Sequence, residues 1–457
     1  MIEPFREYSK TKYKQISSML YDYNNFKSEG KWLYEHFELD KYKDFPYDFF
    51  TFVGENYKDY ECFQNHVYLH KNEQLDESFY KLSNDFKDAA YACAEHMTEG
   101  ERIERLDLLI FPLAYLYRHS IELLLKASIL KEKINQGETN DKTLLEEITN
   151  HDLSALLDII INFNQNNLES KNQHIEWLKA YLDDLSNFDK MSDSFRYPFK
   201  IFKEYNKLKI EYVFEEQRSI CLIYLVEKFE YAYKIIENLY NNDLEDFTYD
   251  NSETLSTEFL DKGRYYYLQC VVGRKYNLSE LSMYSRSYSS LAEHLFKQTI
   301  QNKNKIKNVQ FFKPICYLYQ NAIEVLFKAI STLVLDNQSA LRLMYENKHK
   351  IEESWKKIYE RLSRDWNDLE HYKEKIDDIL KYLSPSAKVP VDTHSFRYPV
   401  NKNGQRTFKD ETKFHIGYVF FFLKDSIDKI SGLYYRYDEF IDYINEMKQE
   451  MGGYDGF

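Results

Sequence analysis

The stretch FPLAYLYRHSIELLLKAS at Phe111–Ser128 returns later in the chain as FKPICYLYQNAIEVLFKAI at Phe312–Ile330. The glutamates of the two stretches, Glu122 and Glu324, lie 202 positions apart (324 − 122). Two further blocks recur in the same order at nearly the same spacing: AEHM at 94–97 with AEHL at 292–295, and SFRYP at 194–198 with SFRYP at 395–399. Three blocks in one order at a near-constant offset indicate a tandem duplication, and we refer to its halves as copy one and copy two.

Both copies have the sequence pattern of helical bundles. Glycine and proline, the residues that interrupt helices, number only 12 and 8. Apolar periodicity predicts these helices in copy one: Asp85–Thr98, Leu106–Lys131, Leu153–Asn164, Ile175–Leu185 and Arg218–Leu239. Asp152 is placed to cap the third helix, and each SFRYP is expected at a helix end because its proline disfavours helical geometry before it. The sequence therefore predicts an all-α fold of two tandem bundles.

The boundaries follow from the duplication and from composition. Residues 80–240 and 264–445 are the predicted bundles, and residues 1–79 precede them. A linker is expected at 241–263, where NNDLEDFTYDNSETLSTEF is acidic and rich in turn formers. Short strands are expected before each bundle, in ECFQNHVYLH at Glu61–His70 and in YYYLQCVVG at Tyr265–Gly273.

Composition narrows the function classes. The formal net charge of −14 disfavours non-specific binding to nucleic acid or anionic membranes, although a local basic cleft is compatible with it. The five cysteines show no CxxC spacing, and no phosphate-binding, dinucleotide, zinc-protease or nucleophile-elbow motif is present. The longest apolar run, Leu106–Tyr117, is too short to cross a bilayer. We expect a cytoplasmic protein without cofactor, metal or membrane partner.

Polar residues form a stripe on the repeated helix. Tyr115, Glu122 and Lys126 share one face of the helix in copy one. A glutamate buried there needs a partner, because an unpaired carboxylate in the interior costs several kcal/mol. Each copy offers two candidate partners, the lysine one turn later (Lys126 or Lys328) and the arginine of SFRYP. The interpretation we prefer is that Arg196 pairs with Glu122, and Arg397 with Glu324, which would pin each SFRYP onto its own helix. The alternative is a functional anion site built on the arginines.

The two copies differ on this stripe. Arg118 and His119 of copy one are replaced by Gln320 and Asn321 in copy two. Any chemistry on this face is therefore expected in copy one, where a histidine and a cation stand together. The alternative is that both pairs only satisfy polar contacts.

These residues resemble the HEPN superfamily of helical-bundle proteins. In copy one the likeness is carried by YRHSIELLLKA at Tyr117–Ala127, by HDL at His151–Leu153 and by SFRYP. In copy two it is carried by YQNAIEVLFKA at Tyr319–Ala329 and HSFRYP at His394–Pro399, without a clear HDL. The resemblance implies an all-α bundle that pairs with a second such unit, here as an intramolecular pseudo-dimer.

The resemblance also implies an activity. Many HEPN proteins are metal-independent ribonucleases of toxin–antitoxin, abortive-infection or CRISPR-linked defence, with an arginine followed a few residues later by a histidine near the dimer interface. Here Arg118 and His119 are adjacent. Two spaced pairs, Arg342 with His349 and Arg364 with His371, have no equivalent in copy one and are interpreted as chance matches.

The leading hypothesis is a bacterial defence or toxin-type protein that acts on RNA, with Arg118, His119 and Arg196 as the catalytic residues. The predicted binding residues are Glu122, Lys126, His151, Tyr197, Glu324, Lys328, His394, Arg397 and Tyr398. The expected partners are RNA, a cognate antitoxin or defence-system protein, and a second copy of the chain. The alternative hypotheses are a non-catalytic HEPN-like module that binds a ligand or protein, and a plain interaction scaffold.

Overall fold

The computed structural model describes the greater part of the chain from residue 66 onward. The described ranges are 66–69, 74–99, 103–138, 145, 147–163, 173–197, 199–205, 207–214, 216–244, 247–249, 255–261, 268–273, 280–301, 310–366, 369–383, 395–401, 404–408 and 412–452. Helices dominate these ranges, which confirms the predicted all-α class. The predicted region 1–79 lies outside them except for its last residues.

Copy one is arranged around one central helix, α4. Its helices are α3 (Leu75–Thr98), α4 (Ile103–Asn135), α6 (Leu153–Phe163), α7 (Gln173–Phe188) and α8 (Leu222–Asn241), with the 3-10 turn η4 (Glu147–Thr149). Every residue of α4 from Leu109 to Leu130 is buried, because α3, α6 and α8 all pack around it. An almost wholly apolar helix is stable in water only when it is covered in this way.

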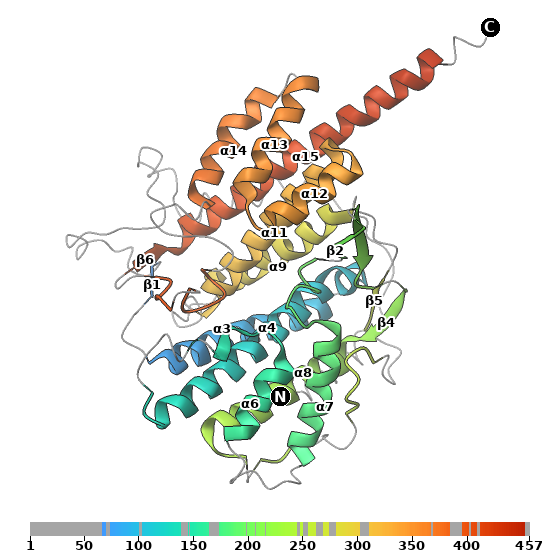
Figure 1. Ribbon diagram of the computed structural model, residues 1–457. Helices are drawn as coiled ribbons and strands as arrows, with labels where there is room; N and C mark the ends of the chain where they lie inside the picture. The colour runs from blue at the N-terminus through green and yellow to red at the C-terminus, as the bar shows by residue number, and fades with distance from the viewer. Residues whose placement is uncertain are drawn as a thin grey trace, which may run out of the picture.

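Copy two repeats this plan around helix α11. Its helices are α9 (Leu281–Gln301), α11 (Phe312–Val334), α12 (Asn337–Asn347), α13 (Ile351–Asp365), α14 (Glu370–Leu383) and α15 (Ile416–Gly452). Helices α9, α12, α13 and α15 pack against α11. In Figure 1 the two copies are stacked one above the other, with α3 and α4 of copy one facing α9 and α11 of copy two.

One predicted helix begins later than expected. The range Arg218–Leu239 was predicted as helical throughout, but Arg218–Cys221 form strand β4 and helix α8 begins only at Leu222. Strand β4 pairs antiparallel with β5 (Gln269–Val272), and Ile220 lies opposite Cys270. The prediction was wrong here because a partner distant in sequence, and not local propensity, fixes this backbone.

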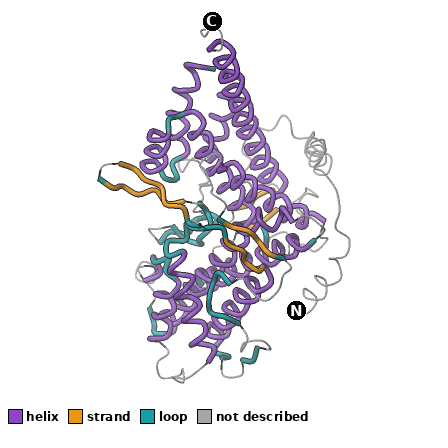
Figure 2. Tube along the Cα trace, turned by 90° about the vertical axis from the view of Figure 1, so that its right-hand side faces the viewer, coloured by secondary structure: helices purple, strands orange, loops and turns teal. Residues whose placement is uncertain are grey.

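The strands exchange between the copies. Strand β1 (His66–Leu69), which precedes copy one, pairs with β6 (Thr412–His415), which leads into the last helix of copy two. Reciprocally, β5 precedes copy two and pairs with β4, which leads into the last helix of copy one. Strands near both predicted positions are thus confirmed, and each copy holds the leading strand of the other. A third pair, β2 (Phe199–Glu204) with β3 (Lys207–Tyr212), forms a hairpin that projects from the body in Figure 2.

Aromatic rings fill the contact between the two central helices. Tyr115 of α4 stacks on its counterpart Tyr317 of α11, with ring centroids 4.6 Å apart and an interplanar angle of 16°. Both side chains are fully buried. Because equivalent residues of the two copies meet here, this stack lies at the centre of the contact between the copies.

Helix α4 also has the length and apolar composition of a membrane span. Among the described helices, this is the one segment that does so, at Glu104–Asn135, and 94% of its most apolar window is buried inside the protein. The apolar stretch is therefore longer than the run Leu106–Tyr117 suggested. Core helices of soluble proteins meet the same criteria, so the match is weak support for a membrane position.

The histidines of the AEHM and AEHL blocks meet between α3 and α9. His96 stacks on His294 with ring centroids 3.5 Å apart, and the Nδ1 atom of His96 lies 3.4 Å from Glu99. Burial and the charges of Arg105 and Lys297 lower the pKa of His96 to about 4. Burial and the adjacent His96 lower the pKa of His294 to about 3. Both rings are therefore neutral at pH 7.

We predict acid sensitivity from this stack. An unfolded histidine titrates near pH 6.5, so these two rings contribute stability that is complete above that pH and is lost as the pH falls toward about 4. Chemical denaturation at pH 7 and pH 5 should show a smaller loss of unfolding free energy in His96→Asn/His294→Asn than in the wild type. An equal loss of unfolding free energy between pH 7 and pH 5 in both proteins would show that the stack does not cause acid sensitivity.

Candidate functional site

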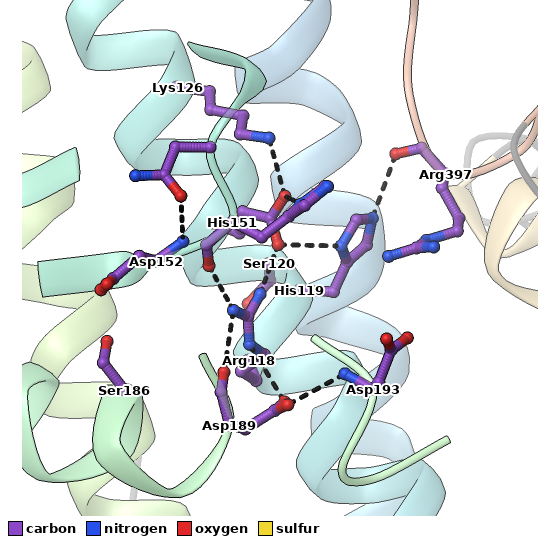
Figure 3. Close-up of polar contacts among 12 residues, drawn as sticks. Arg118, His119, Ser120, Lys126, His151, Asp152, Ser186, Asp189, Asp193 and Arg397 are labelled. Atoms are coloured by element: carbon purple, nitrogen blue, oxygen red, sulfur yellow. Dashed lines mark hydrogen bonds and ion pairs between the residues drawn. The ribbon is translucent and has the colours of Figure 1, made fainter. Parts of the chain in front are cut away.

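Glu122 is the centre of a buried polar cluster in copy one. Its Oε1 atom accepts hydrogen bonds from Lys126 Nζ (2.8 Å), His151 Nδ1 (2.8 Å) and the Tyr398 hydroxyl (2.7 Å). Its Oε2 atom is paired with Arg118, one helical turn earlier. We call these five residues cluster one, and Figure 3 shows its arginine, lysine and histidine.

Glu324 is the centre of an equivalent cluster in copy two. Its Oε1 atom accepts from Lys328 Nζ (2.8 Å), His349 Nδ1 (2.9 Å) and the Tyr197 hydroxyl. Its Oε2 atom lies 3.6 Å from Arg196 Nη2. We call these five residues cluster two. The two glutamates thus make the same three bonds through Oε1 and face an arginine through Oε2.

The SFRYP motifs are exchanged between the copies. Tyr398 belongs to copy two and bonds to Glu122 of copy one, whereas Tyr197 and Arg196 of copy one bind Glu324 of copy two. The predicted pairing of Arg196 with Glu122 was therefore wrong in its partner. The predicted pairing of Arg397 with Glu324 was wrong in another way, because Arg397 lies over the Tyr115 and Tyr317 rings while its neighbour Tyr398 makes the bond to Glu122. Each motif crosses to the other bundle, where its tyrosine binds the glutamate of the other copy.

The residues that differ between the copies hold the exchanged motifs. His119 Nε2 lies 3.1 Å from the backbone oxygen of Arg397. Its counterpart Asn321 accepts a 3.2 Å hydrogen bond from Arg196 Nε. Burial and the neighbouring Arg397 hold the pKa of His119 well below its usual value, so its ring stays neutral. Although the residue type differs, this position contacts the arginine of the other copy's SFRYP motif in both halves.

Arg118 explains the asymmetry of the clusters. It is fully buried, and its Nε atom lies 3.3 Å from Asp189 Oδ2 in addition to its pair with Glu122. Asp189 in turn accepts 2.9 Å bonds from the backbone N–H groups of Asp193 and Ser194, which start the SFRYP turn. In cluster two the position of Arg118 is a glutamine, and Arg196 from the exchanged motif faces the glutamate instead.

Both central glutamates stay ionised. Burial by itself raises the pKa of Glu122, but Lys126 and Arg118 outweigh it and hold that pKa well below the usual range. Burial likewise opposes ionisation of Glu324, and Lys328 with His349 holds its pKa well below the usual range. Each cluster is thus a set of charges that the protein interior accepts because they neutralise one another.

Each cluster reaches the surface through its histidine. The side chain of His151 is 33% exposed and that of His349 is 49% exposed, whereas the two glutamates are nearly inaccessible. His151 lies two residues before the start of α6, whose first turn is capped by Asp152 Oδ1 at 3.2 Å from Ser154 N. His349 follows Lys348, which has a φ of 46°, uncommon for a side-chain-bearing residue, and precedes α13.

The structure groups the predicted residues differently from the sequence. Arg118 and His119 lie at cluster one, whereas Arg196 makes its bonds in cluster two, and all three are buried. Arg397 Cζ stands 5.7 Å from the Tyr115 ring centroid and 5.8 Å from that of Tyr317, at the centre between the copies. His394 lies outside the described residues.

Sequence reasoning missed His349 and Asp189. His349 was interpreted as part of a chance match. It lies two residues before a helix and 25 positions after Glu324, much as His151 lies two residues before a helix and 29 positions after Glu122. The signal was the order glutamate, then histidine at a helix start, in both copies. Asp189 carried no signal, because its role depends on the turn it caps.

One group among the described residues has the composition of a metal site. Ligand atoms of His96, Glu99 and His294 lie within 4.8 Å of one another. The two imidazoles are stacked at an interplanar angle of 18°, so their nitrogen lone pairs run side by side and do not converge on one point. This group is therefore not a formed metal centre.

Comparisons of the chain with protein-family models, with curated proteins and with solved structures find no match.

We predict that the exchange can be measured by coupling energies. Tyr398→Phe removes the donor of one hydrogen bond and Glu122→Gln removes the charge of its acceptor, so a double-mutant cycle on the unfolding free energy should give a coupling of about 1 kcal/mol. The matched cycle of Tyr398→Phe with Glu324→Gln joins separate clusters and should be additive within about 0.5 kcal/mol. Coupling to Glu324 and additivity with Glu122 would refute the exchange.

Proposed function

We propose that this protein is a metal-independent endoribonuclease of a bacterial defence or toxin-type system, with His151 and His349 as its acid–base groups. The observation that carries the proposal is that each cluster presents one partly exposed histidine, oriented at Nδ1 by a buried ionised glutamate. The HEPN-like sequence blocks lie in the same elements.

The hydrogen bonding gives each histidine a defined tautomer. A carboxylate can only accept, so Nδ1 carries the proton and Nε2 has a free lone pair in the neutral ring. A ring held in this way can remove a proton from a 2′-hydroxyl group and later return one to the leaving oxygen. The glutamate also stabilises the positive charge that forms on the ring during the transfer.

Cations stand beside each histidine. Lys126 and His151 share the Oε1 atom of Glu122, and Lys328 and His349 share that of Glu324. Cleavage of RNA by the 2′-hydroxyl needs a base and a positive charge near the phosphate, and it needs no metal ion. Arg118, His119 and Arg196 are buried and act, in this proposal, as positioning residues that hold the clusters and the exchanged motifs in place.

A second candidate is a non-catalytic HEPN-like module that binds a ligand or a protein partner such as an antitoxin. The observation that favours it is the saturation of the clusters by internal contacts. The pocket beside Glu324 and Lys328 has a volume of about 10 Å³, which holds no more than a water molecule. In this case the glutamates, lysines and exchanged tyrosines serve only to lock the two copies together.

The catalytic proposal predicts cleavage that survives chelation. Purified protein incubated with total RNA in excess EDTA should produce fragments, and His151→Asn/His349→Asn should lower the rate by about 100-fold or more. Asparagine keeps a side-chain N–H for the glutamate but cannot transfer a proton at neutral pH. Gel electrophoresis of the RNA over time gives the rates.

The matched control is His174→Asn, because His174 bonds to the Tyr231 hydroxyl at 2.6 Å and belongs to neither cluster. This control should cleave like the wild type. If the wild-type protein leaves the RNA intact, the nuclease hypothesis is rejected and the non-catalytic binding module is the hypothesis that stands. Cleavage that persists in the double variant would move the active site away from both clusters.

A further inference from the structure

A cationic groove lies along helices α12 and α13 of copy two. It is a surface pocket of about 300 Å³. Its lining residues are Leu335, Ser339, Arg342, Leu343, Lys357, Glu360, Arg361 and Arg364. Four of these are cations and one is acidic, although the whole chain carries a net charge of −14. The groove is therefore locally positive although the protein as a whole is negatively charged.

The helix pattern aims the cations into the groove. Lys357, Arg361 and Arg364 follow one another at helical spacing and share a stripe of α13, while Arg342 faces them from α12. The opposite stripe of α13, with Trp355, is buried in the core. One of the four, Lys357, also lies 3.6 Å from Glu346 Oε2 at the exposed surface. The cations still outnumber the carboxylates around the groove, so an anion bound there would lower the energy.

The duplication shows that the fold does not require these cations. Helix α13 begins at Ile351 and its counterpart α6 at Leu153, 198 positions earlier (351 − 153). At this offset Ile358 matches Ile160, and both are buried. At the same offset the groove residues Lys357 and Arg361 correspond to Ile159 and Phe163 of copy one. The core positions are kept while the cations occur in copy two, which points to a role beyond packing.

The groove leads toward the exposed histidine of cluster two. Leu343 lines both the groove and the small pocket beside Glu324 and Lys328. Helices α12 and α13 are joined by the turn that carries His349. A strand that bound the four cations and continued along this helix pair would reach the histidine of cluster two.

We infer that this groove binds the phosphodiester backbone of single-stranded RNA and guides it to the histidine of cluster two. The inference rests on the proposed function for the choice of RNA as the ligand. Arginine forks match phosphate oxygens in geometry and keep their charge at every physiological pH. The groove would thus define copy two as the RNA-docking half of the molecule.

Binding is tested separately from cleavage with an uncleavable probe. A fluorescent 12-nucleotide 2′-O-methyl RNA lacks the attacking hydroxyl, and fluorescence anisotropy gives its affinity at several salt concentrations. Arg342→Gln/Arg364→Gln should weaken binding by about tenfold or more at low salt and should reduce the slope of log K against log salt by about 1.4, since each lost phosphate contact contributes about 0.7. Melting curves of all variants verify folding, and the two arginines are exposed, so folding should be retained.

The matched control is Lys356→Gln/Lys448→Gln, which removes two exposed charges outside the groove. Its binding should stay within about twofold of the wild type and keep the salt slope. Equal loss in both double variants, or no binding by the wild type, would overturn the groove. Loss restricted to the groove variant in a protein that never cleaves RNA would support the groove and reject the nuclease. If the protein cleaves RNA and the groove variant binds the probe as tightly as the wild type, the groove is rejected and the nuclease is supported.

Discussion

A carboxylate buried at the middle of an apolar helix is the constraint on which the rest of this structure depends. Glu122 and Glu324 are almost completely buried, so the protein must supply nearly all of the bonds they make. Part of that demand is met locally, by lysines one turn away. A histidine of the same copy and the tyrosine of the opposite copy supply further bonds, so neither glutamate has all its hydrogen-bond partners within its own bundle. The exchanged strands have the same consequence for the backbone, since each leading strand finds its partner in the other copy.

Duplication with exchange allows the two clusters to diverge without loss of the fold. Arg118 neutralises Glu122 from the same helix, whereas Glu324 is faced by Arg196 from the other copy. The Arg-His pair of copy one, which the sequence marked as the chemical difference, contributes to this internal balance. The surface groups differ more freely. Cations line α13 where α6 has the partly buried Ile159 and Phe163, so these positions differ while the fully buried stripe is kept.

Much of the architecture followed from local rules. The 3.6-residue period placed the central helices, and the i,i+4 rule placed Lys126 on Glu122, as found at 2.8 Å. Asp152 was recognised as a helix cap from its position alone. The failures were non-local. Strand β4 was read as helix because its partner lies some fifty residues away, and His349 was dismissed because its link to Glu324 is spatial.

The sequence by itself determined the duplication, the helical class and the need of each buried glutamate for cationic partners. The tertiary structure alone decided which copy's SFRYP motif completes each cluster. The two SFRYP motifs are identical in sequence, so a motif could pair with the glutamate of its own copy or with that of the other copy through the same local contacts. Only the path of the chain, which packs α4 against α9 and α11 against α3, brings each motif to the other helix. The same packing leaves the histidines, and not the arginines, at the surface.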